Sequence, residues 1–421
     1  MLLFVRAPLV VVFALSPLAI QSAPLTLEEA VRIAENANPA IRTAQAAIHA
    51  AEGQRSESRA PFWNNPELSL EGSRTRIPQA TAPGDRFNAW RAGVSQSFEL
   101  AGQQGRRREA AEAEIAAISA NIAEVRTTLR AEVEQRFVQV LALQLRASVE
   151  QRTVSIVEQA AAAMTKRLDA GEVSRLDANL ARVETERARN QLIQLDEQLT
   201  QARAELATLL QLPPGELPEA VGELRRDAAY TLEDLLQAAS RRRQLETFAR
   251  REQAARSRLE LERAARYPDV TLGLFSGRDG PPDLRENLVG LSVSVPLPLF
   301  RRNEAGIGRA MTELTQVQVE RQAAERDAPA GVRAQWQRLT QLEGRAKRLR
   351  EAVLRTLEDN QRLSETALRE GEIGIAELLL VNRQVAETRR ELLEAETELR
   401  LARVALERAA GWPPVESKET K

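Results

Sequence analysis

The chain has 421 residues, of which 43% are apolar, 28% are charged and 4% are aromatic. This apolar content is too high for an intrinsically disordered chain, and the balance of 59 basic against 60 acidic residues leaves no charge excess for nucleic acid. The absence of cysteine excludes disulfides, thiolate metal sites and a lipid-modified N-terminal cysteine. The single histidine, His49, argues against a multi-histidine metal site within one chain.

Residues 1–23 have the features of a secretory signal peptide. Arg6 precedes an apolar run over 7–20, and small residues follow in Gln21-Ser22-Ala23. The run, about 14 residues long, is shorter than the roughly 20 residues that a membrane-spanning helix needs. Because no later window is apolar enough for such a helix, we expect an exported chain that enters a membrane, if at all, as strands.

The mature sequence contains two copies of one unit. The segment 94–100 (VSQSFEL) returns as 293–299 (VSVPLPL), and 168–173 (LDAGEV) returns as 368–373 (LREGEI). These matches occur in the same order at a spacing of roughly 200 residues, the signature of an internal duplication. We therefore expect a first repeat over 24–214, a linker over 215–229, a second repeat over 230–414 and a charged tail over 415–421.

Each repeat is predicted to contain helices, one strand pair and one long helical hairpin. Thr26 with Glu29, and Thr231 with Asp234, have the spacing of a capping box at a helix start. Alternating apolar residues predict strand pairs over about 66–98 and about 268–297. Apolar residues over 115–140 recur about every 3.6 positions and predict a helix on the order of 90 Å long. The hairpin turns are expected near 171 and 371.

Aromatic residues gather in and beside the predicted strands, mostly near the strand ends. Such positions are typical of the interfacial girdles of outer-membrane barrels. An ordinary soluble hairpin with an aromatic core is the alternative. The predicted membrane-interface aromatic residues are Phe62, Trp63, Phe87, Trp90, Phe98, Tyr267, Phe275 and Phe300.

Two repeats supply four strands per chain, which is too few to close a membrane barrel on their own. The smallest such barrels have about eight strands, and unpaired edge amides are costly in lipid. Several copies must therefore complete the sheet, giving eight strands from two chains or twelve from three. Because eight-stranded barrels are filled by their own side chains, a conducting pore favours three or more chains.

These features together resemble the TolC-like outer-membrane factors, the outer membrane efflux protein family. The likeness covers nearly the whole mature chain. It is carried by the duplicated unit, by the opening segment 25–30 (LTLEEA), and by Gly171 and Gly371 followed six residues later by Asp177 and Glu377. The segment 95–102 (SQSFELAG) is most similar to the branch that serves cobalt-zinc-cadmium resistance.

The resemblance implies a mainly α fold with a small β part. Long helical hairpins would form a periplasmic α-barrel, and three chains would form a 12-stranded β-barrel in the outer membrane of a Gram-negative bacterium. The homotrimer would contact outer-membrane lipid, a periplasmic adaptor protein and an inner-membrane pump of the resistance-nodulation-division type. It would be a passive exit duct, for divalent heavy-metal cations or, alternatively, for multidrug or type I secretion cargo.

By the same resemblance, the hairpin tips carry the working residues. Gly171, Val173, Gly371 and Ile373 would contact the adaptor. Asp177 and Glu377 would ring the aperture, with solvated acids at a helix start as the alternative reading. Arg175 and Arg383 would form ion pairs at the tips, unless they serve only as surface residues.

A reading from another class is an exported coiled-coil adaptor or scaffold that never enters a membrane. Such proteins also contain helical hairpins, although two copies with strands at matched positions are not their usual pattern. Enzyme function has no support, because no nucleophile–base group, glycine-rich phosphate loop or metal-ligand spacing is present in the sequence. We therefore expect no catalytic activity and no cofactor.

Overall fold

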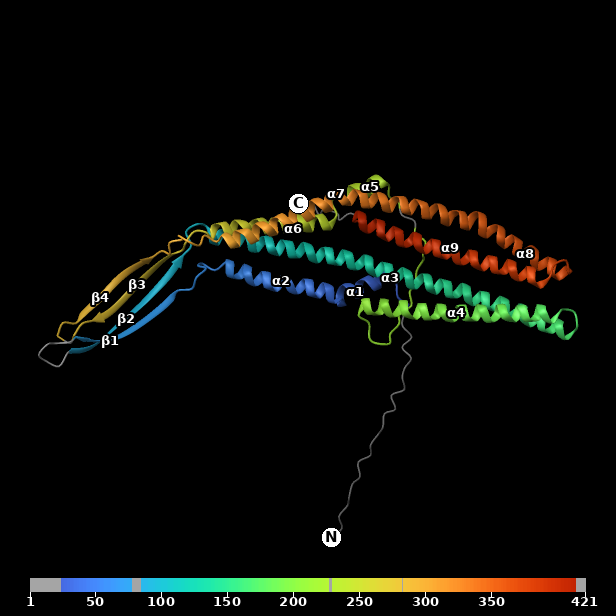
Figure 1. The fold of residues 1–421 in the computed structure, drawn as a ribbon, viewed down its shortest axis with the longest axis horizontal. Helices are drawn as coiled ribbons and strands as arrows, with labels where there is room; N and C mark the ends of the chain where they lie inside the picture. The colour runs from blue at the N-terminus through green and yellow to red at the C-terminus, as the bar shows by residue number, and fades with distance from the viewer. Residues whose placement is uncertain (1–23, 78–84, 227–228, 282, 414–421) are drawn as a thin grey trace, which may run out of the picture. The chain divides into compact units, whose positions relative to one another are not determined.

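The computed structural model describes residues 24–77, 85–226, 229–281 and 283–413. The predicted signal peptide and charged tail lie outside these residues. Over the described residues the chain is mainly helical with one four-stranded sheet, which confirms the predicted fold class (Figure 1). Its elements are α1 (Leu27–Ala37), α2 (Pro39–Ser58), β1 (Glu67–Ile77), β2 (Asp85–Phe98), α3 (Gln103–Asp169), α4 (Arg175–Leu210), α5 (Leu232–Ala239), α6 (Arg243–Ala264), β3 (Val270–Asp279), β4 (Glu286–Ser294), α7 (Glu304–Arg348), a π-helical turn (Leu349–Leu354), α8 (Arg355–Glu370) and α9 (Ile375–Ala410).

The chain divides into two compact units, and each unit takes segments from both sequence repeats. The first unit comprises the chain up to Ala34 together with Val133–Leu224 and Glu351–Thr397. The second comprises Glu35–Glu132, Arg225–Arg350 and the chain from Glu398 onward, and it contains the whole sheet. The long helices α3 and α9 each contribute to both units.

Both predicted helix starts are capped by the side chains that the spacing indicates. The Thr231 hydroxyl accepts a hydrogen bond from the Asp234 amide (3.2 Å), and the Asp234 carboxylate accepts one from the Thr231 amide (2.8 Å). This last bond lowers the pKa of Asp234. Thr26 and Glu29 form the same reciprocal pair at α1. The caps satisfy amides that the first helical turn leaves free.

In the second unit, the capped helix α5 packs on the last helix and on α7. Leu235 and Ala239 of α5 form a buried cluster with Val332, Leu339 and Leu406. Around this cluster, Tyr230 and Trp412 meet edge to face with their ring centroids 5.6 Å apart. Residues from both ends of the second repeat therefore share one core.

The sheet is antiparallel throughout, in the order β1-β2-β3-β4. The central pairing, between β2 and β3, joins the two repeats. Leu68, Val94, Leu274 and Leu291 lie opposite one another in a row that crosses all four strands. Strands β1 and β4 are the two edges.

Candidate functional site

One face of the sheet is apolar and exposed. Because side chains alternate along a strand, the register places the row of Leu68, Val94, Leu274 and Leu291 on the same face as its neighbours two residues away. The nine large apolar side chains on this face are 47% to 83% exposed. An apolar patch of this kind on an isolated chain marks a contact with a membrane or a partner. The face comprises Leu68, Leu70, Trp90, Val94, Leu272, Leu274, Val289, Leu291 and Val293.

The opposite face carries small and polar side chains. One of its rows joins Glu67, Ser95, Gly273 and Ser292, and the next places Phe275 between Gly93 and Gly290. The Phe275 ring covers Gly290, where an added Cβ would lie only 2.4 Å from the ring. A sheet with one apolar and one polar face suits a wall between lipid and water.

The predicted interface aromatic residues do not all point in one direction. Tyr267 and Phe300 are exposed, as are Phe62, Trp63 and Trp90, with Phe300 reaching 95%. Phe87 and Phe275 are partly buried and lie on the small, polar face, because their register positions are out of phase with the leucine rows. Which of the eight contact lipid stays a prediction.

Three of these rings take part in the junction between the strands and α3. Phe98, the last residue of β2, meets Phe62 edge to face at 5.4 Å between centroids. The Arg107 guanidinium lies 3.7 Å from the centroid of Trp63, a cation–π contact, and it binds both carboxylate oxygens of Glu99 at 2.7 and 2.9 Å.

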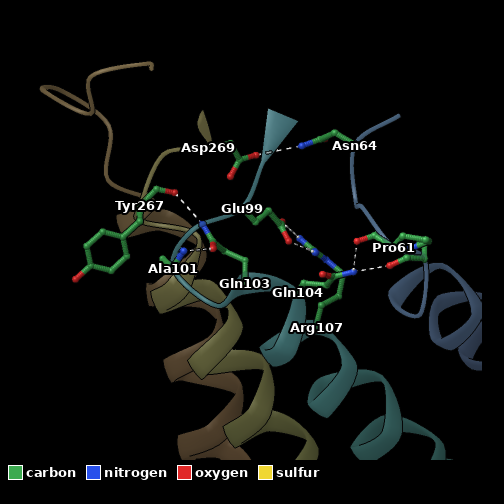
Figure 2. A network of polar contacts seen from close by, with 10 residues as sticks. Pro61, Asn64, Glu99, Ala101, Gln103, Gln104, Arg107, Tyr267 and Asp269 are labelled. Atoms are coloured by element: carbon green, nitrogen blue, oxygen red, sulfur yellow. Dashed lines mark hydrogen bonds and ion pairs between the residues drawn. The ribbon is translucent and has the colours of Figure 1, made fainter. Parts of the chain in front are cut away.

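Figure 2 shows how this junction ties together segments from both repeats. The Gln104 side-chain amide donates to the carbonyls of Ala60 and Pro61 before β1. The Gln103 amide donates to the Tyr267 carbonyl before β3 at 3.2 Å, and Asn64 donates to Asp269 at the same distance. These bonds fix the ends of β1, β2 and β3 to the start of α3.

The two helical hairpins end in turns of the same geometry. Gly171 and Gly371 adopt φ values of 78° and 79°, a left-handed conformation that favours glycine. In the first turn the Gly171 amide donates to the Leu168 carbonyl and the next amide to the Arg167 carbonyl, both at 2.9 Å. The second turn repeats both bonds two hundred positions later.

The two acidic residues beyond these turns differ in their surroundings. The Asp177 carboxylate caps its own helix, accepting hydrogen bonds from the hydroxyl (2.7 Å) and amide (3.3 Å) of Ser174. In the second repeat Gly374 occupies the cap position and offers no hydroxyl. Glu377 is exposed, and its carboxylate has no hydrogen bond or ion pair with the described residues. Glu377 is therefore the more available charge.

The tips of both repeats share a small core in the first unit. Met164, Ala181, Ile375 and Leu378 are buried together, and Val173 packs against them. The other predicted tip residues are partly buried or exposed: Ile373 is partly buried, and Arg175 is exposed without an ion-pair partner among the described residues. Arg383 is exposed and lies 3.8 Å from Glu387 of its own helix.

Sequence reasoning missed the buried ion pair between the hairpins. Glu150 of α3 is 1% exposed, and both its oxygens bind the Arg390 guanidinium of α9, one of them at 2.8 Å. Two pairs that are more exposed, Arg189–Glu158 and Arg389–Glu358, stand at equivalent positions of the two repeats. The Glu150 pair has no such counterpart, so the duplication gives no signal for it.

In the part of the chain that the structure describes, no helix is both long and apolar enough to cross a membrane. Over the same residues, no group of three or more histidine, cysteine, aspartate and glutamate side chains is arranged to hold a metal ion.

Comparison with known proteins identifies the chain. The model of the outer membrane efflux protein family matches residues 30–211 and 235–412, which together cover both repeats. The chain belongs to this family. The predicted function, an outer-membrane efflux channel, and the predicted location in the outer membrane of a Gram-negative bacterium, reaching into the periplasm, are confirmed. The alternative, an exported coiled-coil adaptor or scaffold outside the membrane, is therefore wrong.

Relatives and solved structures agree with this assignment. The efflux protein is 30% identical over 298 residues to the cobalt-zinc-cadmium resistance protein CzcC of Cupriavidus metallidurans, covering 70% of this chain and 68% of the relative. It is 26% identical over 266 residues to the pyoverdine export outer membrane protein OpmQ of Pseudomonas putida, covering 60% and 56%. Structures of CusC (TM-score 0.72, 19% identity, 93% of each chain) and of VceC from Vibrio cholerae (0.70, 18%, 91% and 96%) share its fold.

Proposed function

We propose that three copies of this efflux protein form the passive exit duct of a tripartite efflux system for divalent heavy-metal cations. The observation that carries the proposal is the two-faced sheet, which has an apolar face, a polar face and, among the described residues, only four strands. Three copies supply twelve strands, enough for a water-filled barrel. The apolar face would then contact outer-membrane lipid, and the polar face would line the channel.

The duct itself catalyses nothing and needs no cofactor. Energy would come from an inner-membrane pump of the resistance-nodulation-division type, linked to the duct by a periplasmic adaptor. The adaptor would bind the hairpin tips, where Gly171, Val173, Gly371 and Ile373 form two matching turns. The tip core that joins Met164 to Ile375 supports this role, because it holds the turns of both repeats in one unit.

Heavy-metal cargo is supported by the likeness to the cobalt-zinc-cadmium resistance protein. Deleting the gene should lower the concentrations of zinc, cobalt and cadmium that the host tolerates, and a plasmid copy should restore them. Dyes and antibiotics serve as the comparison, since the pyoverdine exporter is also similar. Sensitivity to dyes and antibiotics without sensitivity to metals would overturn the cargo assignment and favour a multidrug duct.

The free carboxylate of Glu377 is proposed to act at the aperture. Three copies would concentrate negative charge and favour cations. We expect Glu377→Lys to lower the cation preference of single channels in planar bilayers severalfold. Asp177→Lys is the matched control, because it makes the same change of charge at a carboxylate that is engaged in a cap, and it should change the cation preference less. Unchanged conductance and ion preference in Glu377→Lys would remove Glu377 from the aperture.

A further inference from the structure

We propose a specific pairing between copies, in which β4 of one copy runs antiparallel to β1 of the next with Val293 opposite Leu70 and Ser292 opposite Glu71. This inference rests on the proposed trimer and adds the register that closes it. Strands β1 and β4 are the only edges of the described sheet, and they lie at its opposite ends. Edge amides left unpaired in lipid are costly, so each edge needs a partner strand.

The duplication allows the strands of the two repeats to be matched. Val94-Ser95 of β2 corresponds to Val293-Ser294 of β4 in sequence. Within the first repeat Leu68 lies opposite Val94, and within the second Leu272 lies opposite Val293. Leu68 is therefore the structural counterpart of Leu272, and the residues two positions further on correspond in the same way.

The observed pairing between repeats then predicts the pairing between copies. Val94 of β2 lies opposite Leu274 of β3. Their counterparts are Val293 of β4 and Leu70 of β1. If each junction in the ring repeats the internal one, Val293 lies opposite Leu70 of the neighbouring copy.

This register also fits the lengths and faces of the two edges. It places Glu286 opposite Ile77 and Ser294 opposite Ser69, so that every residue of β4 has a partner within β1. On the apolar face Val293 meets Leu70, Leu291 meets Gly72 and Val289 meets Arg74, and Ser292 meets Glu71 on the polar face. A slip of one residue would turn the apolar face of one strand toward the channel.

The implied barrel has ordinary dimensions. The row that starts at Leu68 and crosses to Leu291 continues at Gly72 of the next copy, a shift of four residues per copy. Three copies then give a shear of about twelve and, with a rise of about 3.3 Å and a strand spacing of about 4.8 Å, a tilt of about 35°. A slip of two residues in one direction would give a tilt of about 19°, far below the usual range of roughly 35–45°, and a slip in the other direction a tilt of about 46°, at the upper end of that range.

The segments beside the edges support the same neighbour. Inside the chain, the segment after β2 is bonded to the segment before β3 through Gln103 and Tyr267 (Figure 2). The equivalent segment after β4 ends in Phe300, which is 95% exposed, and the segment before β1 exposes Phe62 and Trp63. The proposed register brings these two segments together.

Disulfide trapping tests the register, and the chain has no native cysteine to interfere. Ser292→Cys is combined in turn with Ser69→Cys, Glu71→Cys or Ser73→Cys, all exposed positions on the polar face. The full-length protein in the outer membrane is oxidised and run on non-reducing denaturing gels. We expect the pair with Glu71→Cys to give at least fivefold more covalent dimer and trimer than the other two, and reductant should abolish these bands.

Native mass measurements on the same variants test the trimer separately from the strand register. Trimers whose strongest trapping occurs with Ser69→Cys or Ser73→Cys, or with none of the three, overturn the register and leave the trimer standing. A protein that is monomeric or dimeric in mild detergent overturns the proposed assembly itself. Cross-links within one chain cannot mimic the expected bands, because they do not raise the mass.

Discussion

Arg390→Leu is expected to destabilise the first unit by about 3–5 kcal/mol, because it leaves the buried Glu150 carboxylate without its partner. The carboxylate is 1% exposed and cannot be rehydrated without opening the contact between α3 and α9. For a unit of this size, each kcal/mol lowers the unfolding midpoint by roughly 2–4 °C. Circular dichroism of the helices in detergent measures this midpoint.

The repeat itself provides the control for this experiment. Arg389→Leu removes the adjacent arginine, whose pair with Glu358 is partly exposed, and should cost at most about 1 kcal/mol. The double variant Glu150→Leu with Arg390→Leu removes both charges and should recover most of the loss. Equal unfolding midpoints for Arg390→Leu and Arg389→Leu would show that the buried pair contributes no more to stability than the more exposed pair.

Leu291→Arg is expected to remove the protein from the outer membrane. Leu291 lies near the middle of β4 on the apolar face and is 83% exposed in the single chain. An arginine on the lipid face near the bilayer centre costs about 2–4 kcal/mol, and a trimer would bear this cost three times. Immunoblotting of separated membranes should show a loss of most of the outer-membrane protein.

Ser292→Arg makes the same chemical change one residue further along the strand. Its side chain points to the polar face, where an arginine can stay hydrated, so the outer-membrane level should remain near that of the unmodified protein. A similar loss in both variants would mean that the two faces are not divided between lipid and water.

The strands and their two faces could be predicted from sequence because the signal is local. Val289, Leu291 and Val293 alternate with small or polar residues, and this alternation is enough to assign a face. The same rule places Phe275 out of phase with Leu274, so the alternation also predicts its position on the polar face. The pairing of β2 with β3 joins distant segments, and no local pattern specifies its register.

The hairpin tips show a comparable division. The turns at Gly171 and Gly371 follow from the repeat, whereas the difference between the two acids depends on one neighbour. Ser174 has capping-box spacing to Asp177 and Gly374 has no hydroxyl, so the sequence alone distinguishes the two acids. The Glu150–Arg390 pair could not be predicted from sequence, because arginine and glutamate are so abundant in this chain that no single pair is distinguished.

The division of the chain into two compact units explains why the two repeats need to stay in one chain. Each unit is completed by segments from both repeats, so neither repeat alone encodes a whole unit. A gene truncated after the linker yields a product that lacks α5 to α9, and with them the buried Leu235 cluster of the second unit and Ile375 and Leu378 of the tip core. If the two repeats were encoded by separate genes, they would have to associate as two molecules after export. In a single chain the two repeats are already linked when the compact units form.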